Sequence, residues 1–200
     1  MDEVKEPILD YNLLDLDGTY TYSDYMRWLF KERVELIKGK IVKMSPGPNR
    51  VHQDLNFTLT GLFYNLFHKQ PCKVYAAPFD VVLPVPSAKK DSTIVQPDLC
   101  VICDLTKLDG QGCKGSPDLI IEILSLGNSK HDMQVKFNLY EESGVKEYWI
   151  VDPVNRSVLL FVLINNKYVG LHPFLEGNAI ESALFPDIKI TVDQIFERVE

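Results

Sequence analysis

The sequence predicts a mixed α/β (α+β) fold, with one mixed β-sheet and helices packed on its faces. Residues 51–67 carry apolar side chains at helical spacing, whereas apolar runs such as 119–124 and 157–163 have the length and composition of strands. Groups of predicted strands separate the predicted helices, as in domains with helices packed on the faces of one mixed sheet. The 200 residues fit one domain, expected at residues 21–200 after an arm at residues 1–20.

Periodicity, capping residues and turn residues predict the individual elements. Lys38-Gly39 and Asn165-Asn166 indicate hairpin turns, and Gly144 indicates the end of a helix. The expected helices are 25–30 (after capping residues 21–24), 50–68 (capped by Asn49), 130–143 (capped by Ser129) and 192–198 (capped by Thr191); the expected strands lie within 34–44 (a hairpin), 73–83, 98–103, 118–124, 146–151, 157–163 and 167–171; residues 45–48 and 84–96 are expected to be loops.

The amino-acid composition limits where the protein can act and what it can bind. No apolar stretch approaches 18 residues, so we expect no transmembrane helix and no membrane partner. The acidic start, MDEVKEPILD, lacks the apolar segment of a secretory signal, and a cytoplasmic location follows as the expectation. The net charge of −7 differs from the basic footprint of most nucleic-acid binders, although it is compatible with an enzyme that has a local basic groove.

The four cysteines are Cys72, Cys100, Cys103 and Cys113, and we expect them to be free thiols, because cytosolic proteins seldom contain disulfides. Cys100 and Cys103 form a CxxC pair inside the apolar run LCVICDL. In a strand, this spacing sends the two side chains to opposite faces. Structural zinc needs four convergent ligands, so we expect no zinc site here.

The stretch from Pro117 to Lys136 gives the clearest indication of chemistry. The strand expected at 118–124 is apolar on both faces, which indicates a central strand covered on each side. Glu122 is then a carboxylate in a buried strand, where a charge must be paired, protonated or bound to a metal. Asp98 adds a carboxylate at the head of another buried strand, and two such groups suit Mg²⁺, which prefers oxygen ligands.

A lysine on the next helix is placed to join these acids. Asp132, Lys136 and Tyr140 are spaced i, i+4 and i+8, so they share one face of the helix. The apolar residues beside that face would pack on the sheet. This packing would aim Lys136 toward Glu122.

These residues belong to a longer series of motifs with a characteristic order and spacing. The series consists of TYSDYMRW, VELIKGKIVKMSP, His52, VQPDLCVI, SPDLIIEILS, the helix with Asp132, Lys136 and Tyr140, and GVKEYWIVDP. From about Tyr20 to Ile195 the chain resembles the PD-(D/E)XK nuclease superfamily. It resembles more closely the bacterial family named "putative restriction endonuclease", formerly a domain of unknown function. The resemblance implies a restriction-endonuclease-like αβββαβ core, with flanking helices and an added C-terminal hairpin.

The resemblance also assigns roles at the metal site, which would lie at the middle strands of this core. Asp98 would be the aspartate of the PD pair and Glu122 the second acid. The usual lysine position, two residues after that acid, holds Leu124 in this chain, and the resemblance places the lysine on the next helix as Lys136. Glu35 would be an auxiliary metal or water ligand.

Three further residues, His52, Asp132 and Tyr140, are expected to support the site. One segment departs from the family pattern. After Glu122 the family leads us to expect a Ser-Pro loop, whereas this chain reads Ser125-Leu126-Gly127. The local geometry of that loop is therefore left open.

The activity implied by the resemblance is metal-assisted hydrolysis of a phosphodiester, with DNA as the expected substrate and Mg²⁺ or Mn²⁺ as the cofactor. A metal held by Asp98 and Glu122 would polarise the phosphate and lower the pKa of a water. Lys136 would orient or deprotonate that water, or stabilise charge on the phosphate. A homodimer would supply the two sites that cutting a duplex needs.

Structural alternatives exist for several of these residues. Glu122 and Lys136 could form a structural ion pair without catalysis. Asp98 could cap a turn after a proline, as could Asp118, for which we prefer the turn role. Glu35 could be a solvated strand residue. His52 could lie on the polar side of its helix, and Trp149 and Tyr148 are expected in the core.

Two other functions compete with the nuclease. The protein could be a nuclease-fold binding or scaffold protein without turnover, which the negative charge favours. The segment Asp15-Leu16-Asp17-Gly18-Thr19 resembles the DxDGT motif of haloacid-dehalogenase-type phosphatases, with Asp15 and Asp17 as its acids. That motif follows an apolar parallel strand, and the preceding ILDYNLL is a poor one. An Asp-Gly turn is the preferred interpretation.

Overall fold

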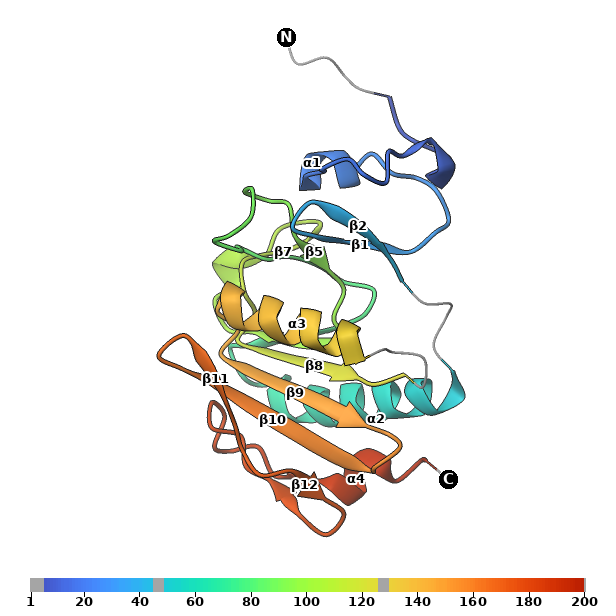
Figure 1. Ribbon diagram of the computed structural model, residues 1–200. Helices are drawn as coiled ribbons and strands as arrows, with labels where there is room; N and C mark the ends of the chain where they lie inside the picture. The colour runs from blue at the N-terminus through green and yellow to red at the C-terminus, as the bar shows by residue number, and fades with distance from the viewer. Residues whose placement is uncertain (1–5, 45–48, 126–129, 200) are drawn as a thin grey trace.

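The centre of the molecule is a seven-stranded sheet, and a second, five-stranded sheet lies beside it. The computed structural model (Figure 1) describes residues 6–44, 49–125 and 130–199, and of these it leaves the side chains of residues 130–132 undescribed. The helices are η1 Tyr11–Leu13, α1 Tyr22–Tyr25, α2 Arg50–Phe67, η2 Leu105–Lys107, α3 Lys130–Ser143 and α4 Val192–Phe196. The strands are β1 Val34–Ile37, β2 Lys40–Lys43, β3 Lys73–Ala76, β4 Asp80–Val82, β5 Ile94–Val95, β6 Leu99–Ile102, β7 Gly112–Lys114, β8 Leu119–Ile123, β9 Glu147–Asp152, β10 Ser157–Ile164, β11 Lys167–Gly170, β12 Phe174–Leu175, β13 Ala179–Ile180 and β14 Ile190–Thr191.

The larger sheet contains the predicted αβββαβ core. Its strand order is β11-β10-β9-β8-β6-β3, with β12 paired to β10. Strands β3, β6 and β8 are antiparallel neighbours, and β8 is parallel to β9. Helix α3 connects β8 to β9, and α2 precedes β3. The β10–β11 hairpin extends the sheet beyond this core, as the predicted C-terminal addition.

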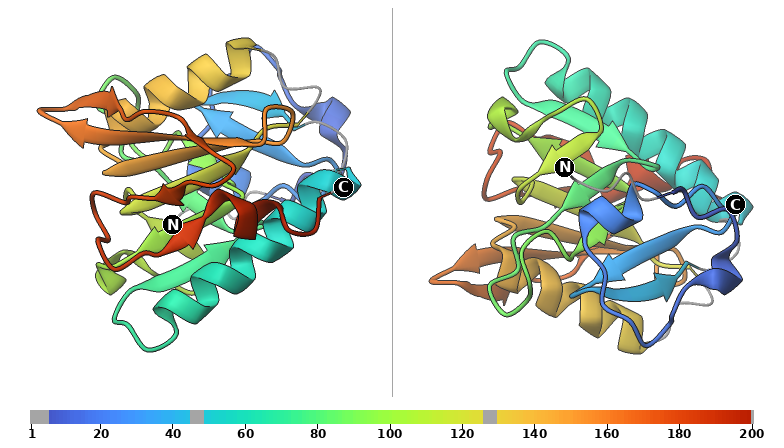
Figure 2. Two further views of the ribbon diagram at one scale, coloured as in Figure 1. Left: turned by 90° about the horizontal axis from the view of Figure 1, so that it is seen from below. Right: turned by 90° about the horizontal axis from the view of Figure 1, so that it is seen from above.

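Apolar layers cover both faces of this sheet, so β8 is a central strand as predicted. On one face, Leu59 and Phe63 of α2 pack in a cluster that includes Ile121. On the other face, Tyr140 of α3 packs in a cluster that includes Ile120. Figure 2 shows α2 and α4 on one side of the sheet and α3, with the β1–β2 hairpin, on the other. Glu122 therefore lies on the α3 side, because alternate strand residues share a face.

Turn and cap residues place most elements where the sequence predicts them. Lys38 and Gly39 have φ of 51° and 83°, and Asn165 and Asn166 have φ of 52° and 61°, as two-residue hairpin turns require. Gly144 has φ of 84° directly after α3. Asn49 and Thr191 cap α2 and α4 as predicted. The predicted loop 45–48, the predicted cap Ser129 and the Leu126-Gly127 segment lie outside the described residues.

The first helix does not span the predicted residues 25–30. Thr21 is its N-cap, and the capping box that Thr21 forms with Asp24 starts the helix at Tyr22. Residues 22–24, predicted as caps, thus form the first turn, and the helix ends at Tyr25. Only Thr21 has the extended backbone of a capping residue, which composition alone does not reveal.

The prediction of a single sheet and of a loop at 84–96 is also wrong. Ile94 and Val95 form β5, which pairs with both β1 and β4. Together with β2 and β7 they make the five-stranded sheet, ordered β2-β1-β5-β4-β7. A strand of two residues is too short to show periodicity, and its partners are distant in sequence.

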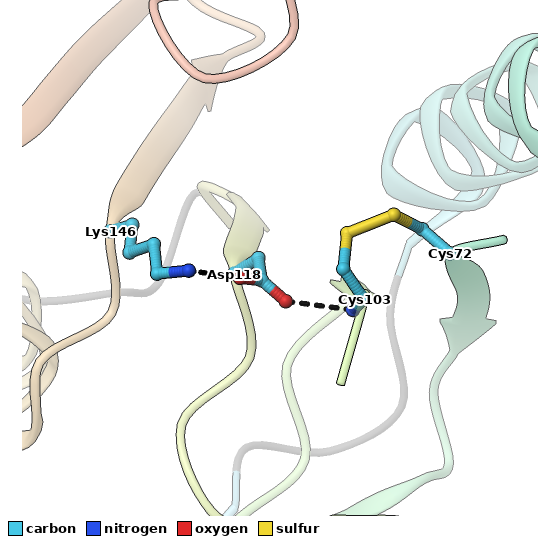
Figure 3. The surroundings of a disulfide bond; sticks show 4 residues. All are labelled: Cys72, Cys103, Asp118 and Lys146. Atoms are coloured by element: carbon cyan, nitrogen blue, oxygen red, sulfur yellow. Dashed lines mark hydrogen bonds and ion pairs between the residues drawn. A yellow bond between two sulfur atoms is a disulfide. The ribbon is translucent and has the colours of Figure 1, made fainter. Parts of the chain in front are cut away.

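The prediction that all four cysteines are free thiols is wrong for Cys72 and Cys103, which form a disulfide (Figure 3). Lys73 of β3 pairs with Ile102 of β6, so the two cysteines occupy the next opposed position of this ladder. Their Cα atoms are 4.0 Å apart. A prediction from cellular redox conditions could not anticipate this pairing, which depends on the strand register.

The other two cysteines are buried free thiols, Cys100 and Cys113. Cys100 lies in the cluster on the α3 side of the sheet, whereas Cys103 packs against the cluster on the α2 side. The expected placement of the CxxC pair on opposite faces is therefore confirmed. Since Cys103 is bonded to Cys72, it has no thiolate to offer a zinc ion. Within the described ranges, no helix has the length and apolar character needed to cross a membrane.

Candidate metal and acid site at the middle strands

The structure brings Asp98 and Glu122 together across the β6–β8 ladder. Leu99 pairs with Ile121 in antiparallel register, so Asp98 and Glu122 are the next opposed residues. Opposed residues on one face of a sheet have Cβ atoms about 4.5–5.5 Å apart. The backbone N–H of Ile123 donates to Asp98 Oδ2 at 2.8 Å, which fixes this carboxylate against β8.

Lys136 contacts two acids from different sheets. Its Nζ lies 2.9 Å from Glu122 Oε1 and 3.0 Å from Glu35 Oε1. Glu35 is on β1 of the five-stranded sheet and only 4% exposed, so the alternative of a solvated strand residue is wrong. The backbone N–H of Gln96 donates to the same oxygen of Glu35 at 2.9 Å. Lys136 thus lies where the helix periodicity predicted, and it joins the two sheets.

Tyr140, one turn further along α3, contacts the same acid. Its hydroxyl donates to Glu122 Oε1 at 2.5 Å, and its side chain is fully buried. Helix spacing placed Tyr140 and Lys136 on one face, and both contact Glu122 from that face. The side chain of Asp132, the third residue of this set, lies outside the described residues.

His52 reaches the site from the first turn of α2. Its Nε2 lies 3.2 Å from Asp98 Oδ2, and it is 8% exposed, so it does not lie on a solvated helix face. Asn49 accepts the backbone N–H of His52 and begins the helix at the position that allows this contact. Burial lowers the pKa of His52, but the hydrogen bond to Asp98 and the charges of Asp98 and Glu122 outweigh it and raise the pKa above its ordinary value.

Burial and crowding of charge change the acidity of the central groups. Burial raises the pKa of Glu122 to about 7; the charge of Lys136 opposes this rise, and those of Asp98 and Glu35 add to it. Burial alone would lower the pKa of Lys136, but the two glutamates raise it well above its usual range. Burial and the charge of Glu122 likewise raise the pKa of Tyr140. Lys136 is therefore a cation, and Tyr140 a neutral donor, at neutral pH.

Among the described residues, the contacts to each central carboxylate fall on one oxygen. His52 and Ile123 both contact Oδ2 of Asp98, and Lys136 and Tyr140 both contact Oε1 of Glu122. Within the described ranges, Asp98 Oδ1 and Glu122 Oε2 accept no hydrogen bond. Two open carboxylate oxygens on adjacent strands are suitable for a hard divalent cation, which keeps several waters. The donor set therefore fits Mg²⁺ or Mn²⁺.

Glu35 does not complete a metal site of three side chains in this arrangement. The part of the chain that the structure describes contains no group of three or more His, Cys, Asp or Glu side chains placed to hold a metal. Glu35 uses Oε1 to bind Lys136 and the backbone of Gln96 instead. Its role as an auxiliary ligand stays a prediction.

Sequence reasoning missed Gln96, which connects the site to the N-terminal residues. Its side-chain amide donates to Asp80 Oδ1 at 2.8 Å, and its carbonyl oxygen accepts from Arg33 at 2.9 Å. Gln96 lies in the motif VQPDLCVI, directly before Pro97 and Asp98. Its position beside the PD pair is the signal that could have identified it.

Several other candidate residues lie outside the site. Asp118 binds the backbone N–H of Cys103 and Lys146 Nζ, each at 2.7 Å, and so joins strand ends near the disulfide (Figure 3). Trp149 and Tyr148 are in the core, at 0% and 2% exposure, as predicted.

The DxDGT segment forms a turn, as preferred from the sequence. Asp15 accepts the backbone N–H of Asp17 on its side chain and that of Gly18 on its carbonyl. The preceding residues Tyr11–Leu13 form a 3-10 helix. The strand that the phosphatase motif requires is therefore replaced by a helix, and the phosphatase alternative is wrong.

Comparisons with known proteins agree with this fold. The crystal structure of a protein from Anabaena variabilis, described as a "putative nuclease belonging to DUF820", matches 89% of this chain and 98% of its own, with a TM-score of 0.69 and 16% sequence identity. Comparison with curated proteins gave no match. Restriction-endonuclease-like families usually use a divalent metal ion. The model of one such family, Uma2, matches residues 22–193, and the chain therefore belongs to this family, whose description is "Putative restriction endonuclease".

Proposed function

We propose that this protein is a Mg²⁺-dependent endonuclease that hydrolyses phosphodiester bonds in DNA at Asp98, Glu122 and Lys136. The observation that carries the proposal is the opposition of Asp98 and Glu122 across β6 and β8, with Lys136 Nζ 2.9 Å from Glu122. Family membership supports the nuclease class.

Each residue has a separate task in this proposal. Asp98 and Glu122 would hold the divalent cation with their open oxygens. The cation supplies Lewis-acid polarisation of the phosphate and lowers the pKa of water. Lys136 stays protonated beside two glutamates, so it stabilises negative charge on the phosphate and orients the attacking water, and is not the general base. Glu35 holds the ammonium group of Lys136 at this position.

Two residues position these groups. Tyr140 donates to Glu122 Oε1, so Oε2 is the oxygen of this carboxylate that would hold the cation. His52 and the backbone of Ile123 hold Asp98 Oδ2, which leaves Oδ1 free for the same purpose. Both are positioning residues, because they act through a carboxylate.

A cleavage assay tests this proposal. The protein is incubated with plasmid DNA, linear DNA and RNA in Mg²⁺, Mn²⁺ or EDTA, beside Asp98→Asn and Lys136→Met. Lys146→Met is the matched control, because Lys146 also pairs with a buried carboxylate, Asp118, away from the site. Cleavage in Mg²⁺ should fall on the order of 100-fold or more in the two site variants and stay unchanged in the control. Equal rates in all four proteins would refute the proposal.

A nuclease-fold binding protein without turnover is the second candidate. It is favoured by the net charge of −7 and by Lys136, which already neutralises the acids that a metal would need. In that case, a mobility-shift assay would show DNA binding, and the cleavage assay would show no metal-dependent product with any of the four proteins.

We also propose that the protein forms a homodimer on duplex DNA. Analytical ultracentrifugation with and without DNA tests this proposal.

A further inference from the structure

A pocket of about 450 Å³ is lined by Gln96 and by residues of the segment 25–34, to which the mechanism gives no role. The residues that matter for its chemistry are Tyr25, Met26, Trp28, Phe30, Arg33 and Gln96. They come from α1, from the segment between α1 and β1, and from the turn before β6. The pocket is therefore built largely by the N-terminal part of the chain against the catalytic core.

Covalent and hydrogen-bonded links connect this pocket to the acids. Val34, which also lines the pocket, directly precedes Glu35. Gln96 directly precedes Pro97 and Asp98, and its backbone N–H binds Glu35. The pocket is thus built from chain neighbours of Glu35 and Asp98, and Gln96 belongs both to its lining and to the hydrogen bonds around Glu35.

Three aromatic residues, Tyr25, Trp28 and Phe30, line the pocket. Trp28 and Phe30 are stacked, with centroids 5.7 Å apart and planes at 28°, and Tyr25 lies 5.7 Å from Trp28. Met26 and Leu29, on the same wall, are 41% and 63% exposed. Within the described ranges, the buried Nε1 of Trp28 has no hydrogen-bond partner. Exposed apolar groups beside aromatic rings form a surface on which a flat ring can stack.

The same pocket carries positive charge in an acidic protein. Lys31 and Arg33 line it and are exposed, against one acid, Glu32. The Arg33 guanidinium donates to the side-chain oxygen of Gln96 at 2.9 Å, so one cation is held beside Gln96, two residues before Asp98. Aromatic rings combined with nearby cations are what binds single-stranded nucleic acid, through base stacking and phosphate contacts.

We propose that this pocket is a subsite for an unpaired nucleotide of the strand that is cut, with the base against Trp28 and Met26 and its phosphate near Arg33 and Lys31. This inference deepens the proposed function and rests on it, since it makes the preferred substrate a single strand, an end or a locally opened duplex. The acids would then cut a phosphodiester close to the bound nucleotide.

Tryptophan fluorescence tests the subsite separately from cleavage. The chain has two tryptophans, and Trp149 is 0% exposed, so a base that stacks in the pocket can quench only Trp28. A short single-stranded oligonucleotide is titrated in Ca²⁺ in place of Mg²⁺, and a blunt duplex of the same sequence is titrated in parallel. We expect quenching by the single strand, little quenching by the duplex, and none in Trp28→Phe.

Charge variants provide the affinity measurement. Lys31→Ala and Arg33→Ala should each weaken binding of the single strand, on the order of 10-fold at low salt and less at high salt, because each removes a cation that can contact a phosphate. Lys189→Ala, which removes an exposed lysine outside the pocket, is the matched control and should bind as wild type. Unchanged Trp28 fluorescence, with all variants binding equally, would overturn the subsite.

Cleavage in Mg²⁺, measured beside these titrations, separates the two proposals. If the wild type cuts DNA while the pocket variants bind and cut normally, the proposed function stands and the subsite fails. If the wild type binds through Trp28 and Arg33 but cuts nothing, the subsite stands and the endonuclease fails. If Lys31→Ala or Arg33→Ala changes only self-association of the protein, the pocket is a protein contact and the subsite is overturned.

Discussion

Lys136 Nζ lies 2.9 Å from Oε1 of Glu122 and, through this contact, ties α3 to the central strand β8. The pair is shielded from solvent, with side chains 21% and 13% exposed. In this environment neither charge is well solvated. Removing one partner therefore leaves the other as an unpaired buried charge, which strongly destabilises the folded protein. The pKa of Glu122 and the unfolding free energy of the protein are therefore coupled.

Lys136→Met should destabilise the metal-free protein by about 3 kcal/mol at pH 8, because it leaves the buried Glu35 and Glu122 without their cation, so that they must stay charged side by side or take up a proton. At pH 5 the loss should be smaller, because Glu122 takes up a proton below its pKa of about 7. Urea unfolding at the two pH values measures the difference. An equal loss of unfolding free energy at pH 5 and pH 8 would show that the destabilisation does not come from breaking the ion pair between Lys136 and Glu122.

Ionisation of Glu122 should lower the stability of the metal-free protein as the pH rises. Burial, with the charges of Asp98 and Glu35, raises its pKa from 4.5 to about 7 against the effect of Lys136, so between these values the folded state binds a proton that the unfolded state lacks. The stabilisation is complete below pH 4.5 and is lost as the pH rises through about 7. It amounts to about 2–3 kcal/mol between pH 5 and pH 8.

Glu122→Gln is the variant that isolates this contribution, because the amide does not titrate. The fall in unfolding free energy between pH 5 and pH 8, measured in EDTA, should shrink by that amount. The control is Glu147→Gln, since Glu147 is a buried carboxylate of the same sheet that binds Trp149 and the backbone of Leu184. Identical pH curves for wild type and Glu122→Gln would contradict the shifted pKa.

Tyr140→Phe should shift the pH dependence of activity upward. The tyrosine hydroxyl lowers the pKa of Glu122 by donating to its carboxylate, so its loss raises that pKa further. If the ionised carboxylate is the active form, the rising limb of the pH–rate profile moves to higher pH, and activity recovers in more alkaline buffer. A uniform loss at every pH would instead indicate a purely structural role.

The disulfide should appear in a thiol count. Unfolded, unreduced protein should show two thiols, Cys100 and Cys113, and reduced protein should show four. Cys72→Ser should lower stability by about 3–4 kcal/mol in the chain-entropy model, since the bond closes a loop with a sequence separation of 31 residues. Four thiols in protein that was never reduced would contradict the bond between Cys72 and Cys103.

Glu122 and Lys136 could be predicted because their signals are local. A carboxylate in a strand that is apolar on both faces must find a partner, and helix spacing put Lys136 and Tyr140 on one face. β5, Gln96 and the disulfide could not be predicted in this way. Each depends on pairing between segments distant in sequence, such as Leu36 with Ile94, and leaves no periodic pattern of its own.

We propose that Asp98 and Glu122 hold a divalent cation and, with Lys136, cut a phosphodiester. The most direct test of this proposal is the rate of plasmid nicking in Mg²⁺ and in EDTA by the wild type and by Asp98→Asn, with thermal unfolding run on both proteins to establish that they are folded. We expect nicking by the wild type that requires Mg²⁺, and a rate lower on the order of 100-fold or more in Asp98→Asn. Nicking that persists in EDTA, or that is equal in the two folded proteins, would contradict this proposal.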